Sequence, residues 1–241
     1  MLDLARQNKL RERYWQLRPE WQPATEFYAE LVRSRLEPSS RVLDLGCGRG
    51  GLVEQLEHPL ELVVGVDPDV ASLQEHRLVG ALPLTAGLSG ALPFVDGSFD
   101  MVFASWVLEH VIKPKKVLGE VGRVLRPGGA FVFITPNKRH PLIGLNRLIN
   151  RFSTLQGRLV RRFYGRKTAD TFPAYYRVNT SAEVRQLAAD LGMTLIVSKL
   201  ISDPSYLVFR PGWFDSAVWF EEHLPPDRAI HLVGMIEKAG E

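Results

Sequence analysis

The sequence predicts an α/β fold built on a parallel sheet. Short apolar runs of strand length alternate with stretches of helical spacing, and turns rich in glycine or proline separate them. The most informative stretch is 41–51, in which Val42, Leu43 and Leu45 lead into a loop that contains four glycines. A strand, a glycine turn and a helix beginning near Gly51 together form a site for a nucleotide-like ligand.

The composition is typical of a soluble globular domain. The chain has 241 residues, 45% of them hydrophobic and 24% charged, which predicts one well-buried domain with insertions. No run approaches the roughly 18 apolar residues of a membrane span, and the N-terminus lacks the apolar core of a signal peptide. The single cysteine, Cys47, excludes a disulfide framework and fits a reducing compartment, so we expect a cytoplasmic protein.

Two interpretations of the glycine loop compete. Gly46-x-Gly48-x-x-Gly51 satisfies the dinucleotide fingerprint, a pattern that is weak by itself. Asp44, two residues before the first glycine, argues against a pyrophosphate, which this carboxylate would repel. A ligand that carries an ammonium group would instead be attracted.

The stretch from Asp44 through Gly46, Cys47, Gly48 and Gly50 resembles the first motif of class I S-adenosylmethionine-dependent methyltransferases with a type 11-like domain. The resemblance implies a Rossmann-like seven-stranded methyltransferase sheet with helices on both faces. It also implies that S-adenosyl-L-methionine is the cofactor and that these five residues bind it. Cys47 is then a small filler residue in the loop rather than a nucleophile.

A second acidic residue ends the next predicted strand, 60–66. Asp67 follows Asp44 by 23 residues, a spacing at which a carboxylate accepts hydrogen bonds from both ribose hydroxyls. With Pro68 it is assigned to the cofactor site. The alternative is that Asp67 caps the helix after Pro68, and a ribose contact fits NAD equally well.

The segment from Ala91 to Asp100 resembles the family's passage from the adenine pocket into the fourth strand. The family often places an aspartate some four residues before the Leu-Pro-Phe of this segment. This chain has Leu88 and Ser89 there. We therefore expect Leu88 to pack on the adenine ring and the backbone of Leu88 and Ser89 to bind its polar edge.

The fourth strand, 99–104, is followed by three candidate site residues. Ser105 is expected near the cofactor, Trp106 near the substrate, and His110 as a general base. The alternative for His110 is a histidine that packs the helix with a local partner. Some family members hold a metal with a Glu-x-x-Glu-His run, but Trp106 occupies the first position here, so no metal is predicted.

Residues 1–40 are predicted to form an N-terminal helical cover, and residues 41–241 the methyltransferase domain. Tyr14 or Trp15 lies over the ligand in one interpretation, and Tyr14 is then a substrate-binding residue. In the other interpretation these helices only cover one face of the sheet.

A helix with Leu118, Val121 and Val124 on its inner face precedes the turn 125–129 and a fifth strand, 130–135. This Leu-Arg-Pro-Gly-Gly turn again resembles the family. With the glycine loop, Asp67 and the fourth strand, it gives four motifs in the family's order over about residues 40–137, a combination not expected of a dehydrogenase.

Residues 138–178 are predicted to be a basic helical lid inserted after strand five. They contain ten basic residues and one acid, a local net charge of +9 in a chain whose net charge is +3. Arg158 and Arg162 are the candidates to bind an anionic acceptor, and the segment is also suited to peripheral contact with an anionic membrane. The alternative is a lid with solvated arginines, and no separate motif favours nucleic acid.

The last part of the chain completes the sheet. Thr180 or Ser181 should cap a helix that ends at Gly192, and strands follow at 193–201 and 230–237. Between these strands, aromatic residues line a substrate pocket or pack in the core: Tyr206, Phe209, Trp213, Phe214, Trp219 and Phe220.

The sequence therefore predicts a methyltransferase for a small-molecule acceptor that is anionic or linked to a lipid or glycan, with O-methylation favoured. One alternative is a non-catalytic S-adenosylmethionine-binding scaffold or regulator, and a second is an NAD-dependent oxidoreductase. The predicted location is the cytoplasm, with peripheral contact at the inner face of the membrane, and the oligomeric state stays open.

Overall fold

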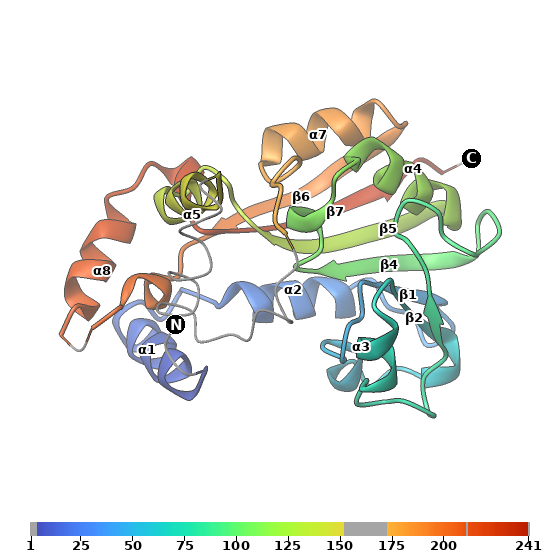
Figure 1. The fold of residues 1–241 in the computed structure, drawn as a ribbon, viewed down its shortest axis with the longest axis horizontal. Coiled ribbons are helices and arrows are strands. Elements are labelled where there is room, and N and C mark those ends of the chain that lie inside the picture. The colour runs from blue at the N-terminus through green and yellow to red at the C-terminus, as the bar shows by residue number, and fades with distance from the viewer. Residues whose placement is uncertain (1–3, 152–172, 211, 241) are drawn as a thin grey trace.

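The computed structural model describes residues 4–151, 173–210 and 212–240, with side chains omitted for 149–151. One mixed sheet of seven strands organises this part of the chain, in the order β3-β2-β1-β4-β5-β7-β6 (Figure 1). The strands are β1 Val42–Leu45, β2 Val63–Asp67, β3 Leu84–Ala86, β4 Phe99–Ser105, β5 Leu125–Pro136, β6 Met193–Ile201 and β7 His231–Lys238. The predicted α/β fold with a seven-stranded sheet is confirmed.

The sheet is parallel except at β7. Strand β1 pairs in parallel with β2 and β4, so the strand order reverses around β1. Strand β7 runs antiparallel between β5 and β6. The carboxyl ends of β1 to β6 and the start of β7 therefore meet at one edge, and the reversal point is where open α/β sheets bind ligands.

Helices cover both faces of the sheet (Figure 1). The helices of the described residues are α1 Leu4–Leu17, α2 Ala24–Arg33, α3 Val70–Gln74, α4 Pro114–Val124, α5 Pro141–Arg151, α7 Ser181–Ala189 and α8 Phe214–Glu222. Helices α2, α3, α4 and α7 pack against strands, whereas α1 and α8 pack against the turn η5 Pro204–Leu207. One apolar core lies between the sheet and α4 with α7, and it contains Leu118 and Val184. A second core joins the other face to α2 through Tyr28 and Val32.

The prediction of a helix that begins near Gly51 is wrong. The segment forms only a short 3₁₀ turn, η1 Val53–Gln55, although Leu52, Val53 and Leu56 are buried as expected. Glu57 has a φ of +50° and Pro59 follows two residues later, so the chain leaves the helical conformation at once.

Two strand starts also differ from the prediction. Strand β2 begins at Val63 because the turn η2 Leu60–Leu62 precedes it. Strand β5 begins at Leu125, which pairs with Phe99, so the predicted turn at 125–129 is a bulged start of the strand. Gly128, at a φ of +74°, allows this irregular stretch.

The remaining elements follow the sequence closely. Thr180 caps α7, and its hydroxyl accepts a hydrogen bond from the backbone N–H of Glu183. Gly192 adopts a φ of +71° just before β6, and β6 and β7 lie where they were expected. In the described ranges, no helix is long and apolar enough to cross a membrane.

Candidate active site

The glycine loop joins the end of β1 to η1. The N–H of Gly46 donates to the carbonyl of Val66 over 2.7 Å, which fixes the loop against β2. Gly46 has a φ of +77°, and a Cβ there would lie 2.5 Å from Cγ2 of Val107. Gly48, at a φ of +51°, has no atom within 4 Å of a Cβ position, so the loop is open at this point.

Asp44 lies beneath the glycine loop on β1 and is 4% exposed. Burial raises the pKa of its carboxyl to about 8, and the nearby carboxylates of Glu54 and Asp67 add to the shift. A cationic ligand group would favour the ionised form of Asp44, whereas a pyrophosphate would be repelled by the carboxylates around it. The side chains present therefore fit the α-ammonium of S-adenosylmethionine.

Asp67 ends β2 and holds the glycine loop. Its carboxylate accepts hydrogen bonds from the N–H of Gly48 over 2.9 Å and of Asp69 over 2.8 Å. Asp69 is the N-cap of α3 and accepts from Ala71 N–H, so the alternative that Asp67 is the cap is wrong. A carboxylate has about four acceptor positions, so Asp67 retains capacity for ribose hydroxyls.

Leu88 and Ser89 lie just beyond β3. The side chain of Leu88 is 66% exposed, and the preceding Gly87 donates its N–H to the carbonyl of Asp67 over 3.2 Å. The exposed Pro68 follows Asp67 directly. These residues lie at the edge of the sheet beside the glycine loop, and their contact with adenine stays a prediction.

The polar neighbour of Ser105 is a residue that the sequence analysis missed. The hydroxyl of Ser105 donates to the hydroxyl oxygen of Tyr28 over 3.1 Å. Tyr28 comes from α2 and is 3% exposed, and burial raises its pKa, with a further contribution from Asp44. Its place on the apolar face of a predicted helix gave no signal that separated it from a core residue.

Tyr14 has a different position from the one expected of a substrate residue. It is buried with Phe214 and Val218 in the cluster that joins α1 to α8, and its ring is edge-on to Trp21. Trp15 is 52% exposed. The packing therefore gives Tyr14 a structural role, and a ligand contact stays a prediction.

The turn η3 Leu108–His110 connects β4 to residues near 175. Nδ1 of His110 lies 2.9 Å from the carbonyl oxygen of Pro173, so His110 has a local partner, and its role as a base stays a prediction.

Glu109, which was not predicted from the sequence, is 5% exposed and accepts a hydrogen bond from the hydroxyl of Thr135 over 3.0 Å. Burial raises its pKa to about 7. Its carbonyl also accepts from the N–H of Tyr175 and Tyr176.

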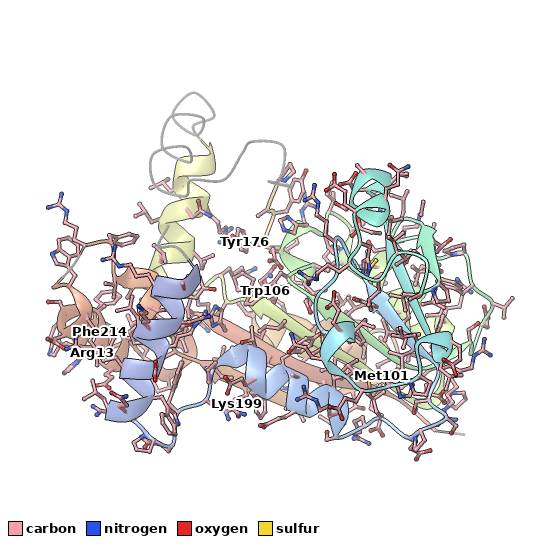
Figure 2. All side chains as sticks on the ribbon, turned by 90° about the horizontal axis from the view of Figure 1, so that it is seen from below. Arg13, Met101, Trp106, Tyr176, Lys199 and Phe214 are labelled. Carbon is pink, nitrogen blue, oxygen red and sulfur yellow. The ribbon has the colours of Figure 1, made fainter. Side chains whose placement is uncertain are left out.

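Trp106 follows Ser105 with a φ of +59°, and in Figure 2 it lies near the middle of the molecule. Its ring packs edge-on against His231, with ring centroids 5.2 Å apart. Tyr206, from the turn η5 Pro204–Leu207, packs against the same histidine. His231 was not predicted, because its neighbours lie more than 20 residues away in the sequence.

The aromatic residues between β6 and β7 divide into two groups. Phe214 is buried and Tyr206 contacts His231, in agreement with core packing. The others are exposed at the surface: Phe209, Trp213, Trp219 and Phe220. The turn η6 Pro226–Arg228 follows α8 and leads into β7.

Only the two ends of the predicted lid belong to the described residues. Helix α5 forms its beginning, and Lys138 and Arg139 beside it pair with Glu183 and Asp227. Arg158 and Arg162 lie outside the described residues.

A family model described as a methyltransferase domain matches residues 43–133. The ubiquinone biosynthesis O-methyltransferase of Nitrosococcus oceani is 31% identical over 149 residues, 56% of this chain and 62% of that protein. The demethylmenaquinone methyltransferase of Symbiobacterium thermophilum is 34% identical over 118 residues, 45% of this chain and 47% of that protein. The chain thus spans about half the length of these curated relatives.

Among solved structures, the S-adenosylmethionine-dependent methyltransferase of Mesorhizobium loti has the same fold. It superposes with a TM-score of 0.59 at 18% identity, over 89% of this chain and 98% of that one.

The fold is that of a class I methyltransferase domain, and residues 43–133 match the methyltransferase domain family model, as the resemblance predicted.

Proposed function

We propose that this protein is an S-adenosylmethionine-dependent methyltransferase that acts on a small-molecule acceptor. The observation that carries the proposal is the buried Asp44 beneath the glycine loop, next to Asp67, which the loop itself holds through Gly48 N–H. A cationic, phosphate-free ligand with a ribose fits these two carboxylates. NAD fits Asp67 alone.

The bound cofactor would supply a methyl group already activated by a positive sulfur. The chain has to hold the cofactor, place the acceptor and exclude water, and orientation alone can contribute several kcal/mol. Asp44, the loop from Gly46 to Gly50, Asp67, Leu88 and Ser105 would hold the cofactor. The ends of β4 and β5 and the start of β7 are left for the acceptor.

We favour O-methylation of an acceptor that is anionic or carried on a lipid or glycan. One of the relatives is named an O-methyltransferase and another a demethylmenaquinone methyltransferase. The net charge of +9 on residues 138–178 supports an anionic acceptor or an anionic lipid surface at this segment. Peripheral contact with the inner face of a membrane is part of this proposal.

Calorimetry with S-adenosylhomocysteine and with NAD tests the cofactor. Binding of the first and not the second is expected, and the reverse result would contradict the proposal. Transfer of labelled methyl groups from S-adenosylmethionine into a cell extract then separates an enzyme from a scaffold. Repeated absence of transfer by a protein that binds the cofactor would favour the scaffold.

A further inference from the structure

His231 lies at the edge of the sheet where the ends of β5 and β6 meet the start of β7. It is the first residue of β7 and pairs with Pro136 at the end of β5 and Ile201 at the end of β6. Its side chain is 3% exposed, and among the described residues its buried Nδ1 atom has no hydrogen-bond partner. A buried polar atom without a partner is costly, which points to a ligand group that pairs with it.

A strained tryptophan borders this histidine. Trp106 has a φ of +59° although its N–H still donates to the carbonyl of Ile134, so the chain turns abruptly while bound to β5. Such a conformation is unfavourable for a bulky side chain and persists mainly at ligand sites. The turn holds the Trp106 ring edge-on to His231. Trp106 directly follows Ser105, which is assigned to the proposed cofactor site.

The other side of His231 is fixed by α1 and η5. The ring of Tyr206 packs on the histidine with centroids 5.0 Å apart, and the guanidinium of Arg11 lies 5.7 Å from the Tyr206 ring centroid. Arg11 Nε donates to the buried carboxylate of Asp203 over 2.8 Å. This pairing balances the charge near the histidine. Burial lowers the pKa of His231 to about 4, so its ring is neutral at physiological pH.

We propose that Nδ1 of His231 accepts a hydrogen bond from the hydroxyl group of a flat-ring acceptor, and that this ring packs against Trp106. The acceptor class is therefore a phenol-like hydroxyl on an aromatic or quinoid ring. This inference rests on the proposed methyl transfer and names its acceptor. It requires the tautomer of His231 that carries its proton on Nε2.

The same atom provides a destination for the proton. The acceptor oxygen keeps the electron pair of its O–H bond and forms the new bond to the methyl carbon. The electron pair of the carbon–sulfur bond stays on sulfur, and the proton moves to Nδ1 of His231. Positive charge is thus lost at sulfur as it appears on the imidazole, so the total charge of the site is unchanged. The imidazolium then releases its proton to water.

Two ring probes that differ only in their hydroxyl groups test the proposal in a binding experiment. Calorimetry on protein saturated with S-adenosylhomocysteine compares 4-butylcatechol with butylbenzene, which has the same ring and tail but no hydroxyl. The parent is expected to bind the catechol at least tenfold more tightly. His231→Phe keeps a flat ring but deletes Nδ1, and it should reduce the preference below threefold with butylbenzene affinity unchanged.

Two further variants separate a specific contact from a structural one. His231→Asn places an amide oxygen near the position of Nδ1 and should restore most of the preference. His58→Phe alters a partly buried histidine that contacts the carbonyl of Ser40 just before β1, and it should behave as the parent does. Loss of the preference in His58→Phe, or its retention in His231→Phe, would overturn the proposal.

A measurement on the parent protein tests the proposal even if the variants fail to fold. The ¹⁵N resonance of His231 Nδ1 should move on addition of 4-butylcatechol and stay in place with butylbenzene. A parent protein without preference for the catechol, or with an unmoved resonance, contradicts the inference. Should S-adenosylhomocysteine itself not bind, the proposed function is wrong, and the two probes are then compared in its absence, so the two failures remain distinct.

Discussion

Asp44→Asn would remove the negative charge that the proposed cofactor site uses to bind an ammonium group. In the free protein the pKa of Asp44 is about 8, so at pH 7 roughly one tenth of the molecules carry this charge. Binding an ammonium requires the ionised form, which costs about 1.4 kcal/mol at pH 7. The affinity of the parent for S-adenosylhomocysteine should therefore rise about tenfold from pH 6 to pH 7 and level off above pH 8.

Calorimetry checks this directly. At pH 7 the parent should release about 0.9 proton for each S-adenosylhomocysteine bound, a value obtained from the heats in buffers of different ionisation enthalpy. Asp44→Asn should release none, show no such pH dependence, and bind about 1.5–3 kcal/mol more weakly above pH 8, the cost of losing a charged hydrogen-bond partner.

Asp96→Asn is the matched control, because Asp96 has a side chain that is 81% exposed and pairs with Arg123 away from the glycine loop. It should bind the ligand as the parent does. An affinity of the parent that stays flat between pH 6 and pH 8, with heats independent of the buffer, would refute the reasoning on Asp44.

Three other predictions follow from single contacts. Asp67→Ala should weaken S-adenosylhomocysteine binding by about 1–3 kcal/mol. Unchanged affinity in the folded variant would mean that Asp67 does not bind the ligand and only accepts the hydrogen bond from Gly48 N–H. Glu109 has a pKa of about 7 against an ordinary value of 4.5, so its protonated form stabilises the fold below pH 4.5 and this contribution is lost as the pH rises through 7. The free energy of unfolding of Glu109→Gln should therefore exceed that of the parent by about 3 kcal/mol above pH 7 and equal it near pH 4.5. Urea denaturation at several pH values measures this, and a difference between the two proteins that does not change with pH would contradict the prediction. Thr180→Ala removes the cap that accepts from Glu183 N–H and should lower the free energy of unfolding by about 1 kcal/mol, whereas Thr180→Ser should not.

The local sequence was sufficient for most of the sheet. Strands β6 and β7 lie as predicted because each is one continuous run bounded by clear signals, such as Gly192 before β6. The segment after Gly51 failed because its apolar spacing was helical while Pro59 and the left-handed Glu57 allowed less than one turn of α-helix. The spacing of apolar residues predicts which side chains are buried. Leu52, Val53 and Leu56 are indeed buried, but in a short 3₁₀ turn and the residues beside it rather than in an α-helix.

The positions of the residues in the proposed cofactor half of the site could also be predicted from the sequence. Asp44, Gly46 and Gly48 lie within five residues, so one strand and one turn fix their arrangement. Asp67 follows at the spacing set by the β-turn-β unit, and the structure adds that the loop holds its carboxylate through Gly48 N–H. Local geometry determines these positions because the chain between them is short.

Only the tertiary structure decided which residues lie in the proposed acceptor half of the site. Tyr28, rather than Tyr14, meets Ser105 across 77 residues of sequence, and His231 meets Trp106 across a still longer separation. No periodicity distinguishes such residues from others on the same apolar face, because their partners are set by how α2, β4 and β7 pack together. The sequence by itself thus determined the sheet, the glycine loop and its two carboxylates. The packing of distant elements determined which buried side chains surround the proposed acceptor position, since contacts between them depend on the whole fold.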